Sequence, residues 1–383
     1  MKGSNVSYKK PKIAFYLSSD IRSYAGIEKY VIPMSNMLDG DVEIYSPSWR
    51  SNTRLTAEEI QKMLKGKVFY YKAVQLPIVR ENIPLSISGI RALIKMMGAD
   101  VIYSTEIGFI PNMLLITISK LLNKKFVLGL HDALFFSTVT PFRRILIRFT
   151  PNMHVQNSFY IDSLHKLNYK GTVYRNPVIL NASKIAPNKI KVNRKAFVVL
   201  YTGRLSVEQK GIDLLVDSIK KVLSTNKEIE FHIVGSGNDG EGIVSNVSSK
   251  YPKNVKRLGF LSEKELHGEY QMASLFAFPS RYESFGLALA EAQCNGLPAI
   301  AFDIPGLADL IDNQNMGVLV KQFDTGKYAQ AILKYYGMWK RDKATYLRLK
   351  EYINHRSKEK YEDSAMVEGH KKIFMTQQSA KEI

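Results

Sequence analysis

Short apolar runs alternate with longer segments of helical periodicity along most of the chain. Mostly apolar runs occur at residues 13–17, 126–130, 196–201, 275–278 and 299–302, and polar residues or glycine follow them. Such runs are typical of strands buried in a parallel sheet, and the periodic segments between them predict crossover helices. The order strand, helix, strand therefore predicts an α/β fold. With 383 residues the chain is long enough for two domains of this kind.

The segment PSRYESFGLALAEAQCNGLPAIAF follows the run at 275–278 and organises the second half of the chain. Its pattern predicts a turn, a helix capped by Ser284 and a second strand at 299–302. Glu283 precedes the helix and Glu291 lies two turns into it. Helical side chains lean toward the N-terminus, so both carboxylates can share a site at the carboxyl end of the strand, where open α/β sheets bind ligands.

Two carboxylates that accept hydrogen bonds from neighbouring hydroxyl groups are suited to a sugar or a ribose, since such bonds contribute about 1.5–3 kcal/mol each. Taken alone, Glu283 would more readily be a solvated loop residue and Glu291 a surface helix residue, since charged residues are mostly exposed. Together with the preceding Pro279-Ser280 and the following Cys-Asn-Gly-Leu-Pro at 294–298, their spacing resembles the signature of glycosyltransferase family 4.

This resemblance implies the GT-B architecture, in which two Rossmann-like domains face each other across a cleft. Residues 1–177 would form the acceptor-binding domain, joined by the C-terminal tail at about 357–383, and residues 178–356 would bind the nucleotide-sugar donor. The boundary coincides with a stretch rich in Asn, Pro and Lys. The resemblance also implies transfer with retention of the anomeric configuration.

A second group of residues points to a diphosphate. The strand at 196–201 runs into Gly203 and Arg204, and Lys210-Gly211 stands at the head of the next predicted helix. Two cations beside a helix N-terminus suit a pyrophosphate, whereas the alternative is a pair of solvated loop cations.

The family resemblance assigns Arg204 and Lys210 to the donor diphosphate, Glu291 to the ribose hydroxyls and Glu283 to the sugar hydroxyls. It implies catalytic roles for Arg204, Lys210, Glu283 and a histidine of the N-terminal domain. The other donor-binding residues that it implies are Gly26, Gly203, Gly259, Phe260, Leu261, Ser284, Phe285, Gly286 and Leu287.

The N-terminal half supplies two candidates. Gly26 follows a strand and a loop and opens a helix, an arrangement that presents backbone N–H groups to a phosphate; the family usually has two adjacent glycines, and here Ala25 precedes Gly26. His131 follows the strand at 126–130, where the family places a histidine close to the transferred sugar. It is the catalytic candidate of this half, with Asp132 as its orienting partner.

The net charge is +19, and the first half carries most of it. Residues 1–177 have 24 Lys and Arg against 12 Asp and Glu, a net charge of +12. Such a surface attracts polyanions such as an anionic membrane face, although it is also compatible with a merely soluble basic surface. The helices predicted at 86–97 and 141–150 are both basic and amphipathic. For 141–150 we favour an apolar side packed inward and arginines in solvent. No zinc-finger or RNP-like segment appears, so nucleic acid is not expected as a partner.

Metal, redox and membrane-spanning roles have little support. The only cysteine is Cys294, which fits a reducing compartment. No histidines have ligand spacing, and Asp39-Gly40-Asp41 is typical of a turn. Residues 107–122 predict a buried crossover helix, and residues 1–12 lack the apolar core of a secretion signal. We expect a cytoplasmic protein, in peripheral contact with the inner face of the plasma membrane.

The sequence therefore predicts a retaining, metal-independent glycosyltransferase. It would need no cofactor, with a UDP- or GDP-type nucleotide sugar as co-substrate, and its partners would be this donor, a glycan or lipid-linked acceptor and an anionic membrane. The alternatives are a nucleotide-sugar epimerase or a phosphorylase of the same architecture, although a phosphorylase would need a cofactor-bearing lysine. A non-catalytic polyanion-binding protein on this scaffold is a further alternative.

Overall fold

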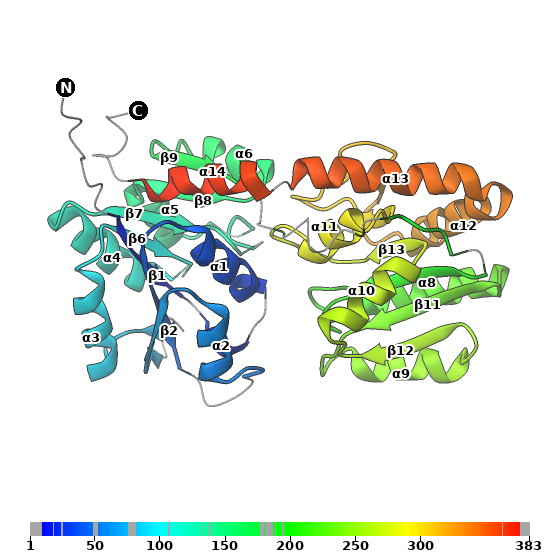
Figure 1. Ribbon diagram of the computed structural model, residues 1–383, viewed down its shortest axis with the longest axis horizontal. Coiled ribbons are helices and arrows are strands. Elements are labelled where there is room, and N and C mark those ends of the chain that lie inside the picture. Colours follow the sequence, from blue (N-terminus) through cyan, green and yellow to red (C-terminus); the bar gives the residue numbers. More distant parts are fainter. Residues whose placement is uncertain are drawn as a thin grey trace, which may run out of the picture. The chain divides into compact units, whose positions relative to one another are not determined.

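The computed structural model divides the chain into two compact units. Unit 1 comprises Met1–Ile179 with Ser364–Ile383, and unit 2 comprises Leu180–Asp363 (Figure 1). The sequence had predicted a change of domain at 177/178 and a tail from about 357. The structure describes residues 10–17, 19–23, 26–48, 53–75, 82–105, 108–132, 134–137, 139–176, 180, 187, 189–193, 195–361 and 363–375.

Unit 1 is built on a seven-stranded parallel sheet with the order β3-β2-β1-β6-β7-β8-β9. The chain starts in the middle of the sheet, builds outward to β3 and returns to pair β6 with β1. Its strands are β1 (Lys12–Tyr16), β2 (Asp41–Pro47), β3 (Lys67–Tyr71), β6 (Val101–Ser104), β7 (Lys125–Gly129), β8 (Asn152–Val155) and β9 (Thr172–Arg175). A short antiparallel pair, β4 (Val74–Gln75) and β5 (Asn82–Ile83), lies outside the sheet.

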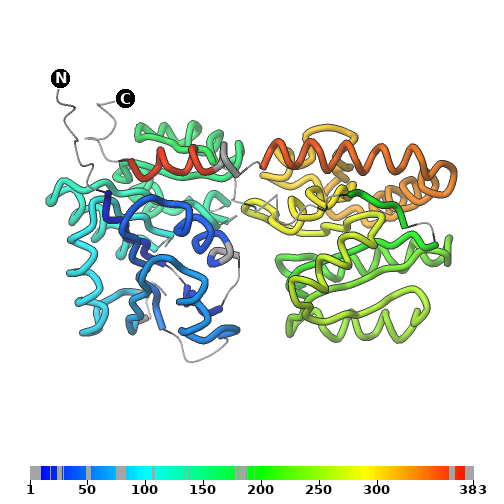
Figure 2. Tube along the Cα trace, in the orientation of Figure 1, coloured from blue at the N-terminus to red at the C-terminus, as the bar shows by residue number. Residues whose placement is uncertain are grey.

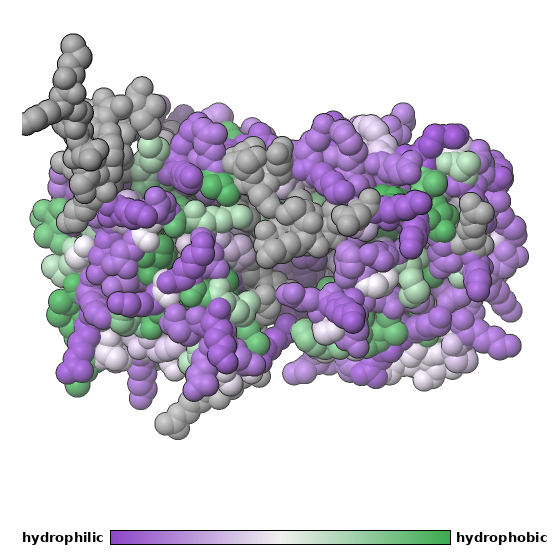
Figure 3. All heavy atoms as spheres, viewed as in Figure 1, coloured by the Kyte–Doolittle hydropathy of each residue, from purple (hydrophilic) through white to green (hydrophobic). Residues whose placement is uncertain are grey.

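The helices of unit 1 cover both faces of this sheet. They are η1 (Ile21–Ser23), α1 (Gly26–Met37), α2 (Ala57–Met63), α3 (Ile87–Met96), α4 (Phe109–Leu121), α5 (Pro141–Phe149), α6 (Ser158–Lys166) and α14 (Asp363–Phe374). One core cluster joins α3, α4, α5 and α6 to the same face of the sheet, because it contains buried residues of all four helices together with Tyr16, Ile102 and Phe126. Figure 3 shows apolar side chains exposed on unit 1 where Figure 1 draws α3 and the end of α4.

The last helix, α14, belongs to the N-terminal unit, as the Cα trace shows (Figure 2). The Phe374 ring packs on Phe15 and Tyr103, with ring centroids 5.4 and 5.5 Å apart. The Lys125 Nζ donates to the backbone oxygen of Met375 at 2.9 Å. Phe15 and Tyr103 alternate with the core residues Tyr16 and Ile102 along their strands, so α14 covers the sheet face opposite to α3–α6.

Helix α5 is only partly as the sequence predicted. Leu146 and Ile147 pack into the core, but Phe142 and Phe149 are 59% and 57% exposed. Ile145 is exposed as well, so the prediction that the apolar side of this helix packs inward is wrong for three of its five large apolar side chains. The reason is that the helix touches the unit along one narrow stripe, and its nine residues carry more apolar surface than that stripe can bury.

Unit 2 contains a six-stranded parallel sheet with the order β12-β11-β10-β13-β14-β15. Its strands are β10 (Phe197–Thr202), β11 (Ile229–Val234), β12 (Val255–Gly259), β13 (Leu275–Phe278), β14 (Ala299–Phe302) and β15 (Gly317–Val320). All residues of β10, β13 and β14 are buried, as the continuous apolar runs predicted. The strand order reverses between β10 and β13, and this switch point is where such sheets bind ligands.

The helices of unit 2 are α8 (Ile212–Thr225), α9 (Glu241–Lys250), α10 (Glu263–Met272), α11 (Leu287–Cys294), α12 (Thr325–Arg341) and α13 (Lys343–Lys360). Helix α10 starts with a capping box, since Ser262 and Glu265 bond each other's backbone N–H. Among the described residues of either unit, no helix is both long enough and apolar enough to span a membrane.

Candidate functional site

The candidate site lies at the carboxyl ends of β10 and β13 in unit 2. These two strands are hydrogen-bonded neighbours, with Leu200 beside Phe276. Gly203 and Arg204 follow the first strand, and Pro279 and Ser280 follow the second. The predicted diphosphate residues and the first predicted carboxylate are therefore brought to one edge of the sheet.

The loop after β10 is held tightly against the loop after β13. Gly211 has a φ of +62° and caps the start of α8. A Cβ atom at this position would lie 2.2 Å from the Pro279 carbonyl oxygen, so only glycine allows the two loops to approach this closely. The N-terminus of α8 has no side-chain cap and starts at this junction.

Lys210 and Glu283 form an ion pair at the centre of the site. The Lys210 Nζ donates to Glu283 Oε1, and the Ser280 hydroxyl donates to the same oxygen at 2.9 Å. The side chain of Glu283 is 7% exposed and that of Lys210 is 21% exposed. A buried carboxylate with two donors on one oxygen leaves its other oxygen available as an acceptor.

Arg204 is exposed beside this pair. Its guanidinium donates to Gln209 Oε1 at 2.5 Å, and its backbone oxygen accepts a hydrogen bond from the Tyr201 hydroxyl at 2.7 Å. Burial, with the negative charge of Glu283 adding to it, raises the pKa of Tyr201, so its phenol stays protonated and holds the loop. The backbone at Arg204 is thus held in place, while its guanidinium remains at the surface.

Glu291 is connected to the end of β10 through a buried tyrosine. The Tyr270 hydroxyl lies 3.1 Å from Glu291 Oε2 as donor and 3.0 Å from Thr202 Oγ1. Burial raises the pKa of Tyr270 well above its ordinary value, and the neighbouring Glu291 carboxylate raises it further. Tyr270 therefore remains a donor that orients Glu291, a role that no sequence signal indicated.

Helix α11, which carries Glu291, starts later than predicted. The capping residue is Gly286, in a left-handed conformation with a φ of +92°, and the helix begins at Leu287. The prediction that Ser284 caps this helix is wrong. The capping position has a positive φ, which glycine adopts without strain and residues with a Cβ rarely adopt, so the helix starts after Gly286. Gly286 has no side chain, so α11 starts without a side-chain cap from its N-cap residue.

Arg281 ties the two loops together and was not predicted as a site residue. Its guanidinium makes two 2.7 Å bonds to the Asp213 carboxylate and also donates to the Val207 carbonyl oxygen. Its backbone N–H donates to the Gln209 carbonyl oxygen at 2.8 Å. The Asp213 pair raises the pKa of Arg281, and Arg281 lowers the pKa of Asp213. Arg281 thus fixes the segment that contains Lys210.

The remaining predicted residues of unit 2 lie around these loops. Gly259 ends β12 with a φ of +66°, Phe260 is 71% exposed and Leu261 is half-buried. Phe285 is buried, whereas Ser284 is half-buried. The strand β12 lies two positions from β10, on the side away from β13.

Gly26 and His131 lie in unit 1. Gly26 begins α1, and Glu28 in the first turn is buried and accepts a hydrogen bond from the Ser19 hydroxyl. Pro33 lies within α1.

His131 belongs to a buried group that we call the histidine–tyrosine cluster. Its members are Tyr30, Tyr103, His131, His154 and His370. The Tyr103 hydroxyl lies 2.9 Å from His131 Nε2 and 2.7 Å from His154 Nδ1. The Tyr30 hydroxyl lies 2.9 Å from His370 Nε2, which connects α1 to α14.

Burial keeps the imidazoles of His131 and His154 neutral. It lowers the pKa of His131 to about 3, with His370 adding to the effect, and it lowers the pKa of His154 well below the ordinary value. The second ring nitrogen of His131 lies 2.9 Å from Gln156 Nε2. The predicted orienting partner Asp132 instead accepts the Leu134 N–H at 3.0 Å, so the prediction for Asp132 is wrong. A carboxylate that caps its own turn is held away from the preceding ring.

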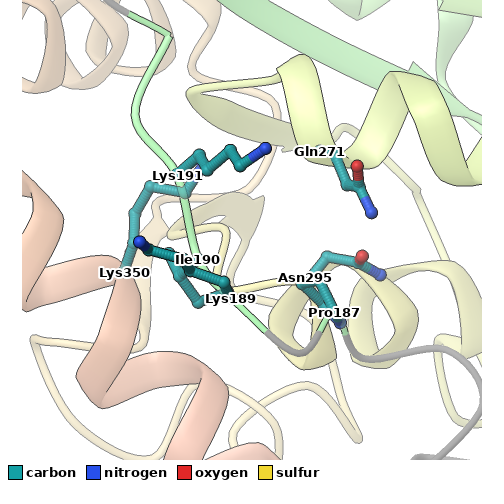
Figure 4. A pocket seen from close by; sticks show the side chains of 7 residues that line it. All are labelled: Pro187, Lys189, Ile190, Lys191, Gln271, Asn295 and Lys350. Carbon is teal, nitrogen blue, oxygen red and sulfur yellow. The ribbon is translucent and has the colours of Figure 1, made fainter.

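A separate hollow in unit 2 is lined by residues of four segments, one of which contributes Asn295 at the end of α11 (Figure 4). Lys350 comes from α13, Gln271 from α10, and Lys189 and Lys191 from the segment that precedes β10. The Lys350 Nζ is buried and donates to the Ala273 carbonyl oxygen at 2.9 Å, and burial lowers the pKa of this lysine to about 7. This hydrogen bond indicates that Lys350 holds α13 against the entry of β13. Within the described residues, no group of three or more His, Cys, Asp or Glu side chains could hold a metal ion.

Part of the chain is similar to a known family and to curated sequences. Residues 196–337 match the family described as "Glycosyl transferases group 1". Over 144 residues the chain is 33% identical to an uncharacterized 41.2 kDa protein in the cps region of Klebsiella pneumoniae, covering 37% of this chain and 38% of that protein. Over 136 residues it is 26% identical to the alpha-D-kanosaminyltransferase of Streptomyces kanamyceticus, covering 35% of each. The chain thus spans little more than a third of the length of these curated relatives.

Solved structures confirm the predicted fold class over nearly the whole chain. Anabaena HepE in complex with UDP-glucose has a TM-score of 0.75 at 15% identity, covering 95% of this chain and 99% of that chain. Staphylococcus aureus TarM in complex with UDP and glycan ligands has a TM-score of 0.74 at 14% identity, covering 96% and 100%. Both likenesses extend over the two α/β units, as the GT-B prediction requires.

Proposed function

We propose that this chain, whose C-terminal unit belongs to the group 1 glycosyl transferases, is a retaining, metal-independent glycosyltransferase. It would move a sugar from a nucleotide-sugar donor to a glycan or lipid-linked acceptor at the cytoplasmic face of a membrane. The observation that carries this proposal is the Lys210–Glu283 pair at the sheet switch point, between two helices that begin with glycine instead of a side-chain cap.

The diphosphate would bind between Arg204 and Lys210. Helix N-termini attract phosphate oxygens; α8 begins directly after Lys210-Gly211, and α11 begins at the end of the loop that carries Glu283. In the absence of donor, Glu283 neutralises Lys210. A bound diphosphate would be a second anion beside Lys210. Lys210 would bind it while Glu283 keeps the lysine in place.

The two carboxylates would orient the sugar nucleotide. The second oxygen of Glu283 would accept from sugar hydroxyls, and Glu291, oriented by Tyr270, would accept from the ribose hydroxyls. Gly259, Phe260 and Leu261 would lie beside the base. The role proposed for His131 is a contact with the transferred sugar. Because its ring is neutral, it would act as a hydrogen-bond partner and not as a proton-transfer group.

The proposed reaction exchanges one bond at the anomeric carbon for another on the same face. The bond from the anomeric carbon to the donor phosphate oxygen breaks, the acceptor oxygen forms the new bond, and the acceptor proton goes to the leaving phosphate. Arg204 and Lys210 would stabilise the charge that develops on the nucleoside diphosphate. Removal of one such preorganised group costs about 10²–10³ in rate in other enzymes.

Calorimetric titration with UDP, GDP, ADP and their sugar conjugates tests the donor site. One nucleotide should bind, and both Arg204→Ala and Glu291→Ala should lose at least about tenfold in affinity, because each removes a charge-assisted bond. Arg348→Ala and Glu351→Ala remove the same charges from the exposed surface of α13 and should bind like the parent protein.

The outcome separates the proposal from its alternatives. Absence of binding by any nucleotide would overturn the proposal and favour a polyanion-binding protein. Conversion of the donor sugar to its epimer without an acceptor would favour an epimerase. Transfer of label from the donor sugar to a glycan or lipid acceptor, lost in Arg204→Ala, would support the proposed reaction.

A further inference from the structure

Exposed apolar side chains are concentrated on one part of unit 1. The described residues include 16 large apolar side chains that are exposed, and ten of them lie on or directly beside α3, α4 and α5. These ten are Leu85, Ile87, Ile90, Ile94, Met97, Leu121, Leu122, Phe142, Ile145 and Phe149. Scattered surface apolar residues need no explanation, but a cluster of this kind marks an interaction site.

The three helices belong to one layer. Their inward residues, such as Ala92, Leu115 and Leu146, join a single core cluster on one face of the unit 1 sheet. Phe109 of α4 and Phe142 of α5 are in ring contact, with centroids 5.2 Å apart. The ten exposed side chains on or beside α3, α4 and α5 therefore lie on the outer surface of this layer. We call this surface the outer face.

Helix α3 turns its larger apolar side away from the protein. Its buried positions include Gly89 and Ala92, and a Cβ atom on Gly89 would lie 2.4 Å from the Pro84 carbonyl oxygen. Ile87, Ile90 and Ile94 lie on the opposite side and are 75%, 45% and 61% exposed. A globular helix normally buries its large residues, so this orientation indicates a partner outside the unit.

Helix α5 repeats the arrangement. Phe142, Ile145 and Phe149 follow the spacing i, i+3, i+7 and are exposed on one side of the helix. Arg144 and Arg148 are exposed directly beside them. Apolar side chains with cations on their flank are typical of helices that lie in the interface of a bilayer.

The charge around the outer face has one sign. The sequence contains no Asp or Glu in residues 82–99, 107–131 or 133–161. Exposed cations on the three helices include Arg91, Lys95 and Lys120, in addition to the two arginines of α5. A second copy of the chain docking through this face would bring like charges together, whereas an anionic lipid surface is complementary to it.

We propose that the outer face binds an anionic bilayer, with the apolar residues of α3 and α5 inserted among the acyl chains and the flanking cations at the lipid phosphates. This inference deepens the proposed function by naming the surface that contacts the membrane of a lipid-linked acceptor. It assigns the membrane contact to both of the helices that the sequence predicted to be basic and amphipathic, and it does not depend on the sugar or the donor.

Sedimentation with vesicles tests the inference without sugar transfer. Vesicles of phosphatidylcholine alone are compared with an equimolar mixture of phosphatidylcholine and phosphatidylglycerol, at low and high salt. The parent protein should sediment with the anionic vesicles at low salt. Arg144→Gln with Arg148→Gln should weaken binding about fivefold for each cation, or roughly 30-fold for the pair. Ile90→Ser with Ile94→Ser should weaken the binding that persists at high salt.

Matched controls come from unit 2. Lys250→Gln with Lys253→Gln removes the same charge, and Met272→Ser with Tyr352→Ser removes two exposed apolar side chains. Both controls should sediment like the parent protein. All variants should keep the parent's nucleotide affinity and thermal midpoint, because the altered residues are at the surface.

The outcomes are distinct. Equal recovery of the parent protein in the supernatant with both vesicles, or equal losses in the outer-face variants and the controls, would overturn the inference. A concentration-dependent dimer that Ile90→Ser with Ile94→Ser dissociates, without vesicle binding, would also overturn it in favour of a second copy. Vesicle binding by a protein that binds no nucleotide would leave the inference standing and overturn the proposed function instead.

Discussion

The Tyr270 hydroxyl allows a sharp test of how Glu291 is oriented. Tyr270→Phe removes one oxygen from a buried position and leaves the ring in place. The lost bond joins a phenol to a carboxylate oxygen at 3.1 Å, and bonds to charged groups contribute about 1.5–3 kcal/mol. If Glu291 holds the donor ribose, the lower value corresponds to a donor affinity about tenfold weaker.

The substitution also affects stability, so it needs a control of the same kind. Tyr346 is a second buried tyrosine of unit 2, and its hydroxyl donates to the Ser274 carbonyl oxygen at 2.9 Å. Tyr346→Phe should cost about 1–2 kcal/mol of stability, like Tyr270→Phe, because each removes a buried hydroxyl that donates a hydrogen bond within unit 2.

Calorimetric titration with the nucleotide that binds the parent protein, together with urea unfolding, separates the two effects. We expect similar losses of stability in both variants and a loss of donor affinity only in Tyr270→Phe. Equal donor affinities in the two variants would refute the argument that Tyr270 orients a donor-binding carboxylate.

Two further predictions follow from the Arg281 contacts and from the histidine–tyrosine cluster. Arg281→Ala and Asp213→Ala should each lower kcat/KM for the donor about fivefold. In a double-mutant cycle the pair should couple by about 1 kcal/mol, because both groups are partly exposed. Strictly additive losses would contradict the argument that the Arg281–Asp213 pair fixes the segment with Lys210. The buried His131 and His154 resist protonation, so below the unfolded-state histidine pKa of about 6.5 the unfolded chain binds more protons than the folded chain. The free energy of unfolding should therefore fall as the pH falls below that value. Urea unfolding at pH 7.5 and 5.5 should differ by about 1.4 kcal/mol for each of these histidines, and His154→Gln should reduce the difference; a pH-independent free energy would show that the rings are accessible to protons when folded.

Several features of the fold and site were predictable because they depend on neighbouring residues in the sequence. The strands before Gly203 and Pro279 are continuous apolar runs, and the structure buries all of their residues. In a parallel sheet the carboxyl ends of adjacent strands meet, so Arg204, Lys210 and Glu283 were expected at one edge, where the structure places them. Their roles in donor binding stay proposals.

Other features depended on contacts between distant parts of the chain. Arg281 and Asp213 are 68 positions apart, and Tyr270 and Glu291 are 21 positions apart. Neither pair has a local signal, because each forms only when the strands take their register and the helices pack on the sheet. The histidine–tyrosine cluster likewise includes His370, which joins it only when α14 returns to unit 1.

The sequence by itself therefore determined the α/β class, the order of the strands along the chain and the edge of the sheet where the cations and Glu283 meet. These follow from hydrophobic periodicity and from the chirality of parallel crossovers, which act over short segments. Only the tertiary structure decided that Gly286 and not Ser284 starts α11, that Tyr270 and Arg281 fix the site, and that α3 turns its isoleucines outward. The physical reason is that a residue's burial is set by what packs against it, and the amphipathic pattern of a helix does not say whether a sheet or a lipid surface will cover its apolar side.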